Sequence, residues 1–99
     1  MDKENVIINK AVTHLNKTYE IAEVYLFGSV MGGNFTDDSD IDMALFLKDY
    51  DKHSLKDFAK TFFYIQNNIS SRIELHFFPA KTEPLTFSQH VRNTGRKVA

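Results

Sequence analysis

The stretch FGSVMGGNFTDDSDIDMALFL, residues 27–47, decides how this chain is organised. A strand-like run ends at Gly28-Ser29, and ten residues later Asp40 and Asp42 lead into a second apolar run. Carboxylates seldom lie at the start of a buried strand without a partner, because an uncompensated charge is costly to bury. The position of the two aspartates therefore needs a physical explanation.

Composition and charge indicate one small globular domain, residues 1–99. The chain has 99 residues, with 12 Lys and Arg against 13 Asp and Glu, so its charge is nearly balanced. General nucleic-acid binding needs a basic face, which this balance disfavours. The absence of cysteine excludes a disulfide framework and a thiolate nucleophile. No apolar run approaches the ~20 residues that span a bilayer, and the N-terminus lacks the core of a signal peptide, so we expect a soluble cytoplasmic protein.

The hydrophobic pattern predicts a mixture of helices and strands. Strands are expected over 22–27, 41–47 and 72–78, and helices over 4–17, 54–66 and 86–93. The run 41–47 is mostly apolar on both faces, which is typical of a strand inside a sheet. Ser54 and Asp57 have the pattern of a capping box. This order predicts an α/β or α+β fold, a small sheet with helices packed against it.

Three smaller expectations complete the pattern. Residues 29–33 are expected to form a short turn or helical segment. One face of the helix that follows Ser54 is expected to be apolar, formed by Leu55, Phe58, Ala59, Phe62 and Ile65. The basic residues near the C-terminus are expected to form a solvated terminus: Arg92, Arg96 and Lys97.

Asp40 and Asp42 have a spacing that suits a metal site. Residues two apart in a strand point to the same face, so these carboxylates are expected side by side while Ile41 turns into the core. Two ionised carboxylates this close repel each other unless a cation lies between them. Hard oxygen ligands suit Mg²⁺ or Mn²⁺, which bind one or two carboxylates together with substrate phosphates.

The acidic stretch has two other interpretations. The aspartates within residues 37–40 can simply solubilise a loop, which is the usual role of an isolated D-x-D. The D-x-D-x-D run of residues 38–42 also matches the opening of a calcium-binding EF-hand loop. That loop needs glycine at its sixth position and glutamate at its twelfth, where this chain has Met43 and Asp49. These mismatches, with the strand-like run that follows, argue against calcium.

Gly28-Ser29 has the features of a phosphate-binding turn. A glycine that ends a strand permits a tight turn and close approach of a ligand to the backbone. Free N–H groups in the following turn can bind anions, and the Ser29 hydroxyl adds a donor. Taken alone, Gly-Ser is a common turn. A phosphate cradle and a metal-binding acidic pair on adjacent strands are complementary halves of a nucleotide site.

A third carboxylate, Glu74, lies in the run RIELHFF of residues 72–78. It shares one face of the expected strand with Arg72 and His76, while the apolar residues turn the other way. The alternative is an edge strand with one wet face. Arg72 could pair with Glu74 or reach a nucleotide. His76 could contact a metal or phosphate, although a partly buried structural role is the commoner one for histidine.

These residues give the chain a family resemblance. Gly28-Ser29 followed after ten residues by Asp40-Ile41-Asp42 resembles the signature of the DNA polymerase β-like nucleotidyltransferases. The short length and the third acidic strand are similar to the minimal nucleotidyltransferases, which are often antitoxin partners of HEPN-domain proteins. The resemblance implies a mixed sheet with flanking helices. It also implies two-metal transfer of a nucleoside monophosphate, AMP from ATP, to a hydroxyl on a helical HEPN-type partner.

The same resemblance assigns roles to single residues. Asp40, Asp42 and Glu74 would be catalytic and would bind Mg²⁺ or Mn²⁺, with Glu74 near the acceptor hydroxyl. The nucleotide would be bound by Gly28, Ser29 and Ser39. The chain departs from the family where Met31-Gly32-Gly33 replaces a common Ala-Arg-Gly, and where Glu74 replaces a frequent aspartate.

Other functions are compatible with this fold. A catalytically weak binding module would neutralise its partner by contact alone. A nucleotidyltransferase that modifies small molecules, of the aminoglycoside type, would need an acceptor domain that these residues do not provide. We expect either a partner subunit or a homodimer to complete the acceptor site.

Overall fold

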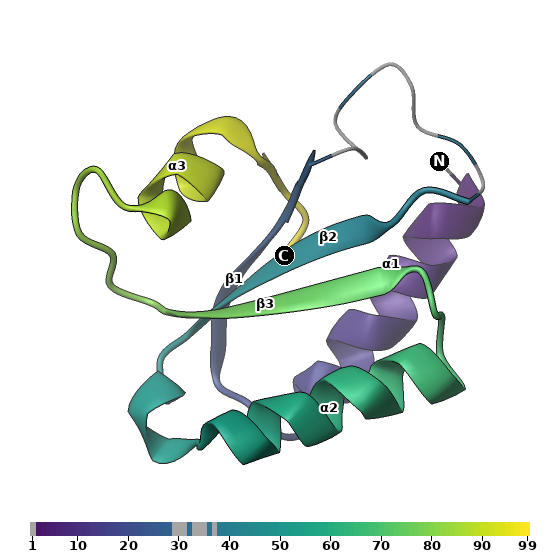
Figure 1. The fold of residues 1–99 in the computed structure, drawn as a ribbon, viewed down its shortest axis with the longest axis horizontal. Coiled ribbons are helices and arrows are strands. Elements are labelled where there is room, and N and C mark those ends of the chain that lie inside the picture. Colours follow the sequence, from purple (N-terminus) through teal and green to yellow (C-terminus); the bar gives the residue numbers. More distant parts are fainter. Residues whose placement is uncertain (1, 29–31, 33–35, 37) are drawn as a thin grey trace.

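A mixed β-sheet forms the centre of the computed structural model, which describes residues 2–28, 32, 36 and 38–99. The strands in these residues are β1 (Ile21–Phe27), β2 (Ile41–Leu47), β3 (Ile73–Pro79) and β4 (Arg96–Lys97), and their spatial order is β3-β2-β1-β4 (Figure 1). The neighbours β1 and β2 are antiparallel, as are β1 and β4, whereas β2 and β3 are parallel. The expected small sheet, with a buried 41–47 strand in its interior, is confirmed.

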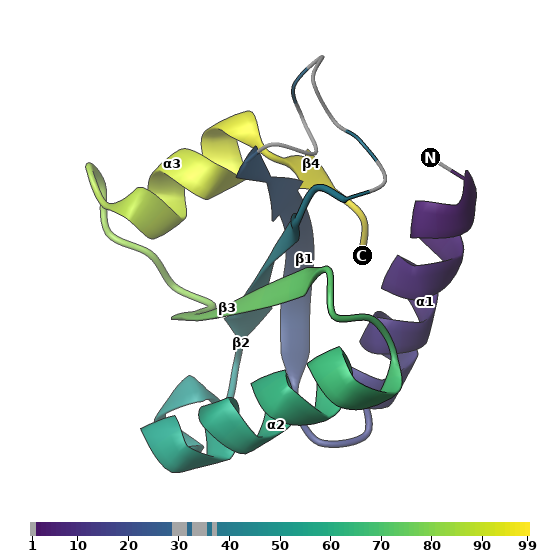
Figure 2. The ribbon, with the colours of Figure 1, turned by 45° about the vertical axis from the view of Figure 1, so that its right-hand side comes forward.

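Helices cover both faces of this sheet. They are α1 (Asp2–Leu15), α2 (Leu55–Asn68) and α3 (Phe87–Thr94), with a short 3₁₀ helix, η2 (Tyr50–Lys52), after β2. Figures 1 and 2 show α1 and α2 on one face and α3 on the other. The described helices are too short or too polar for any of them to cross a membrane.

The alternation of side chains along β2 divides the core between the two faces. Ile41, Met43 and Leu45 are buried in the larger cluster, which includes residues of α1 and α2. Ala44 and Phe46 point the opposite way and pack with Val91 of α3 in a smaller cluster. Since side chains alternate along a strand, Asp42 projects from the α3 face of the sheet.

Local sequence signals account for the helix ends. The Ser54 hydroxyl accepts a hydrogen bond from the Asp57 N–H at 3.2 Å, and the Asp57 carboxylate accepts one from the Ser54 N–H at 3.1 Å. This is the predicted capping box. Thr86 caps α3 by accepting from the Gln89 N–H, and the helix ends before Gly95.

The apolar face predicted for α2 is only partly buried. Phe58 and Ile65 lie in the core, but Leu55 is 81% exposed and Ala59 is also exposed. The expectation for Leu55 and Ala59 was wrong because α2 packs along β3, a strand at the edge of the sheet. Only a narrow stripe of the helix therefore meets apolar partners.

The C-terminal residues are not the solvated terminus that their charge predicted. Arg96 and Lys97 pair with β1 as strand β4, although their side chains stay exposed. Arg92 donates hydrogen bonds to Glu23 at 2.8 Å and to the Ala80 carbonyl at 2.6 Å. An open strand edge leaves N–H and C=O groups unpaired, and the tail satisfies those of β1.

Candidate active site

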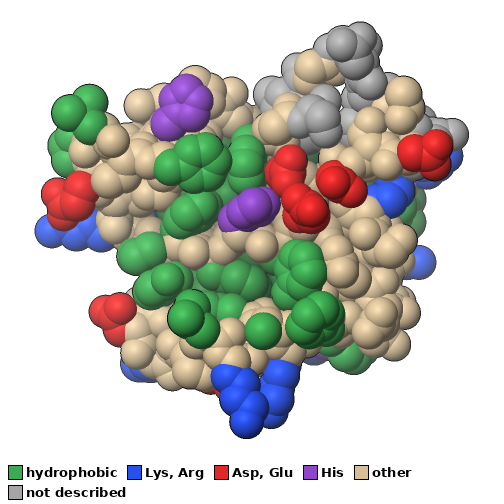
Figure 3. Space-filling view, viewed as in Figure 1, with side chains coloured by type: hydrophobic (Ala, Val, Ile, Leu, Met, Phe, Trp, Pro, Cys, Tyr) green, Lys and Arg blue, Asp and Glu red, His purple; other side chains and the backbone are tan. Residues whose placement is uncertain are grey.

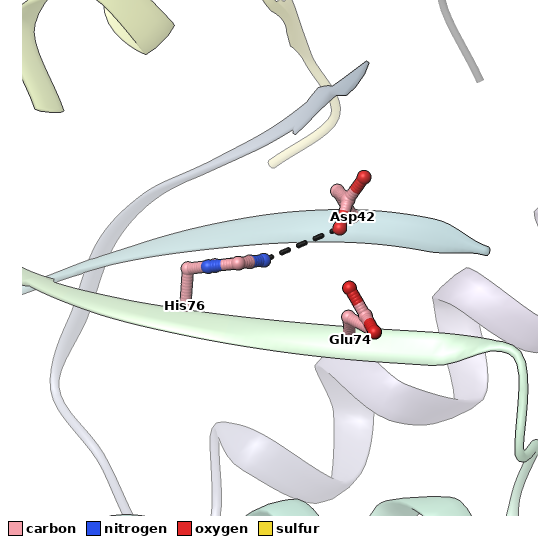
Figure 4. A group of neighbouring side chains, drawn as sticks. All are labelled: Asp42, Glu74 and His76. Carbon is pink, nitrogen blue, oxygen red and sulfur yellow. Dashed lines mark hydrogen bonds and ion pairs between the residues drawn. The ribbon is translucent and has the colours of Figure 1, made fainter. Parts of the chain in front are cut away.

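Three ligand-type side chains converge where β2 and β3 run side by side. One ligand atom from each of Asp42, Glu74 and His76 lies within 4.8 Å of the other two. Nε2 of His76 is 3.2 Å from Oδ1 of Asp42. Figure 4 shows the three side chains on the same side of the two strands, with the carboxylates of Asp42 and Glu74 turned toward each other.

Strand pairing explains this convergence. Asp42 and Glu74 are direct partners in the parallel register of β2 and β3. His76 follows Glu74 by two residues and so shares its face. Figure 3 shows acidic side chains gathered beside a histidine at the border of an apolar surface. The arrangement is thus fixed by the sheet backbone rather than by a loop.

The aromatic ring of Phe27 packs against His76. The Phe27 ring meets the His76 ring edge to face, with centroids 4.9 Å apart. Phe27 is itself the direct antiparallel partner of Asp42. The side chain of His76 is 36% exposed and that of Asp42 is 18% exposed, so both can reach a ligand that arrives from solvent.

The neighbouring carboxylates destabilise the charged form of Glu74. The pKa of Glu74 is raised, first by a hydrogen bond with the Asp42 carboxyl group, then by burial and by the charges of Asp40 and Asp42. Only the interaction with His76 lowers it. A carboxylate with a raised pKa beside another carboxylate is an arrangement that a cation would stabilise.

Gly28 lies against the side chain of Asp42. Its φ is +74°, in the left-handed region that glycine tolerates and other residues rarely adopt. A Cβ at this position would collide with the carboxylate of Asp42. The absence of a side chain at Gly28 therefore leaves room for the Asp42 carboxylate. The close approach of a ligand to this backbone stays a prediction.

The other predicted site residues have different surroundings. Asp40 comes immediately before β2, is exposed, and lies outside the converging group, but its charge reaches Glu74. Ser39 closes a turn by accepting the Thr36 N–H at 2.9 Å. The predicted turn of residues 29–33, with Ser29 as its phosphate ligand, falls outside the described residues apart from residue 32. The nucleotide-binding roles of Gly28, Ser29 and Ser39 stay predictions.

Arg72 has partners that the sequence did not indicate. Its guanidinium group binds the buried carboxylate of Glu4 at 2.9 Å and the carbonyl oxygens of Ser39 and Thr36 at 3.0 and 3.1 Å. The arginine thus links α1 to the segment before β2. It holds in place the backbone from which Asp40 and Asp42 follow.

His76 is the residue whose place in the site the sequence left undecided. The signal was present in the two-residue spacing from Glu74, which puts both on one strand face. The pairing of β3 with β2 could not be predicted from the sequence. That pairing brings His76 to Asp42, 34 residues away in the chain.

The fold and the site define an α/β protein with a candidate divalent-metal centre on one face of a mixed sheet. The family model described as polymerase beta, nucleotidyltransferase, matches residues 9–99. The chain belongs to this nucleotidyltransferase family. The searches of curated proteins and of solved structures gave no match.

Proposed function

We propose that this protein transfers a nucleoside monophosphate, AMP from ATP, to a hydroxyl group on a partner protein. The partner in this proposal is a helical HEPN-type toxin, which the transfer would neutralise. The observation that carries the proposal is the convergence of Asp42 and Glu74 with His76, in a chain whose family is defined by nucleotidyl transfer.

The donor set fits a divalent cation. Two carboxylates face each other from paired strands, and the raised pKa of Glu74 indicates that their charges are poorly compensated by protein groups alone. Asp42 and Glu74 would hold Mg²⁺ or Mn²⁺, with Asp40 adding charge from just before β2. Such ions, when bound, stabilise the entering and leaving oxygens of an in-line displacement at phosphorus.

The reaction requires one bond to form and one to break at the α-phosphorus. The acceptor hydroxyl oxygen forms a bond to that phosphorus, and the bond to the bridging oxygen of the β-phosphate breaks. Pyrophosphate leaves with the electron pair. Glu74 would help to activate the acceptor hydroxyl by accepting its proton, because a carboxylate held beside the reacting oxygen can act as a general base. The bare Gly28 backbone lets the Asp42 carboxylate lie against the end of β1.

The test is transfer of label from ATP that carries radioactive phosphorus at the α-position. Wild-type protein is incubated with Mg²⁺ or Mn²⁺ and a lysate of the source cell, beside Asp42→Asn. Asp51→Asn is the matched control, because Asp51 is an exposed aspartate of η2, beyond the opposite end of β2. A labelled protein band is expected with wild type and Asp51→Asn and not with Asp42→Asn.

The same experiment separates the alternatives. Full labelling by Asp42→Asn would refute the assigned site. A pull-down from the same lysate that recovers a bound partner which never becomes labelled would instead favour inhibition by contact. Label in a small molecule rather than in a protein would identify a different acceptor class.

A further inference from the structure

Asp42 and Glu74 have a nitrogen donor, His76, as their neighbour, and a nitrogen ligand affects which metal ion a site prefers. His76 presents Nε2 to Asp42 at 3.2 Å, and the three donor atoms lie within 4.8 Å of one another. Two neighbouring ligands of one octahedral ion, each at about 2.1 Å, are themselves about 3 Å apart. The His76–Asp42 separation is therefore compatible with a shared ion.

We propose that His76 is a direct ligand in this centre, and that the centre prefers a transition-metal dication such as Mn²⁺ over Mg²⁺. The inference rests on the proposed function, because it concerns the metal of the same site. It goes further by adding a nitrogen ligand to the carboxylates and by naming the class of ion that this ligand favours.

Ligand chemistry supports the preference. Mg²⁺ takes oxygen ligands in near-ideal octahedral geometry and gives up its water reluctantly. Imidazole is above all a ligand of Zn²⁺, Cu²⁺, Fe²⁺ and Ni²⁺, whereas carboxylate oxygens suit Mn²⁺ as they suit Mg²⁺. Mn²⁺ is the transition-metal ion that suits both carboxylates and is also less strictly an oxygen-binding ion than Mg²⁺, so the imidazole nitrogen favours Mn²⁺ of the two. A site designed only for Mg²⁺ would be expected to carry oxygen donors at all three positions.

The packing around the histidine supports a ligand role. The imidazole cannot swing freely, because Phe27 lies edge to face against it at 4.9 Å. Its strand is paired to β2 through the whole length of β3, which fixes the Cα of His76 opposite Ala44. The small Ala44 side chain leaves the imidazole room to reach forward to Asp42.

The proposal is tested by metal binding in the absence of nucleotide. Mn²⁺ binding is measured from the electron paramagnetic resonance of the free ion, and Mg²⁺ binding by its competition with Mn²⁺. We expect wild type to bind Mn²⁺ at least about tenfold more tightly than Mg²⁺. His76→Asn should lose about tenfold or more in Mn²⁺ affinity, given that even outer partners of metal ligands are worth about 10–100-fold. Mg²⁺ affinity should change little.

A spectroscopic measurement separates a ligand from a neighbour. Electron spin-echo modulation of bound Mn²⁺ detects a directly bonded imidazole nitrogen. The nitrogen signal is expected in wild type and in His14→Asn, and not in His76→Asn. His14 is a suitable control because it lies on α1, which covers the opposite face of the sheet.

Each result has a distinct meaning. Mn²⁺ binding that needs Asp42 but shows no nitrogen coupling would overturn the ligand role of His76 and leave the proposed function standing. Equal affinity for Mn²⁺ and Mg²⁺ in wild type would overturn the preference. Nitrogen coupling without any nucleotidyl transfer would support the metal site and count against the proposed reaction. Absence of metal binding would overturn both.

Discussion

Replacing Glu74 by glutamine should stabilise the metal-free protein while weakening its metal binding. Glu74 and Asp42 are direct strand partners whose ligand atoms lie within 4.8 Å. Two unit charges at that distance repel by about 3.5 kcal/mol at an effective dielectric constant of 20, and by about 0.9 kcal/mol in water. Both groups are partly exposed, so solvent screening reduces the effect to about 1–2 kcal/mol.

A gain of this size is measurable by thermal denaturation. For a domain of this length each 1 kcal/mol shifts the melting temperature by roughly 4–8 °C. In EDTA at pH 8 and low salt, Glu74→Gln should therefore melt at least about 4 °C above wild type. Glu83→Gln is the control, since Glu83 is an exposed carboxylate between β3 and α3. Its melting temperature should match that of wild type.

Added metal should reverse the order. Mn²⁺ at a hundred times its dissociation constant stabilises a folded protein by about 2.7 kcal/mol. Wild type has the complete donor set and should gain this stabilisation, whereas Glu74→Gln should gain much less. A Glu74→Gln variant that melts at or below the wild-type temperature in EDTA would show that repulsion between the two carboxylates does not destabilise the metal-free protein.

Four further predictions follow from single residues. Phe46→Ala should cost about 3–5 kcal/mol in urea unfolding, because Phe46 is fully buried in the smaller core cluster. Ser54→Ala should cost about 1 kcal/mol by loss of the α2 cap, with the same assay. Gly28→Ala should weaken Mn²⁺ binding, measured by titration, because its Cβ would displace Asp42. The pKa of Glu74 is raised above 4.5 on folding, so the folded state binds more protons. Metal-free stability should fall as the pH rises from about 4.5 through that raised pKa, and Glu74→Gln should remove this dependence.

Local patterns were enough to predict the elements that build the site. The run 41–47, which is apolar except for Asp42, matches β2 residue for residue, because a strand buried on both faces has a nearly continuous apolar sequence. Ser54 and Asp57 identified the start of α2 through chemistry confined to four residues. Alternation also put Glu74 and His76 on one face of β3.

The pairing of strands that lie far apart in the chain could not be predicted from the sequence. The parallel register that sets Asp42 opposite Glu74 depends on how β3 docks on β2 after α2, and no local pattern specifies it. The strand β4 is two residues long and hydrophilic, so its own sequence does not predict a strand. It forms where it covers the edge of β1. Its formation depends on a tertiary partner rather than on strand propensity.

The contacts of Arg72 explain why no arginine compensates the Asp42–Glu74 pair. Arg72 lies two residues before Glu74, and a salt bridge between them would have lowered the pKa of Glu74. The guanidinium group instead binds Glu4 of α1, 68 residues away, and the carbonyl oxygens of the segment before β2. Glu4 is buried and its pKa is lowered first by this hydrogen bond, so the arginine compensates a charge that would be costly to bury alone. The pKa of Glu74 is raised, so Arg72 does not compensate the Asp42–Glu74 pair, and this is consistent with the metal site proposed above.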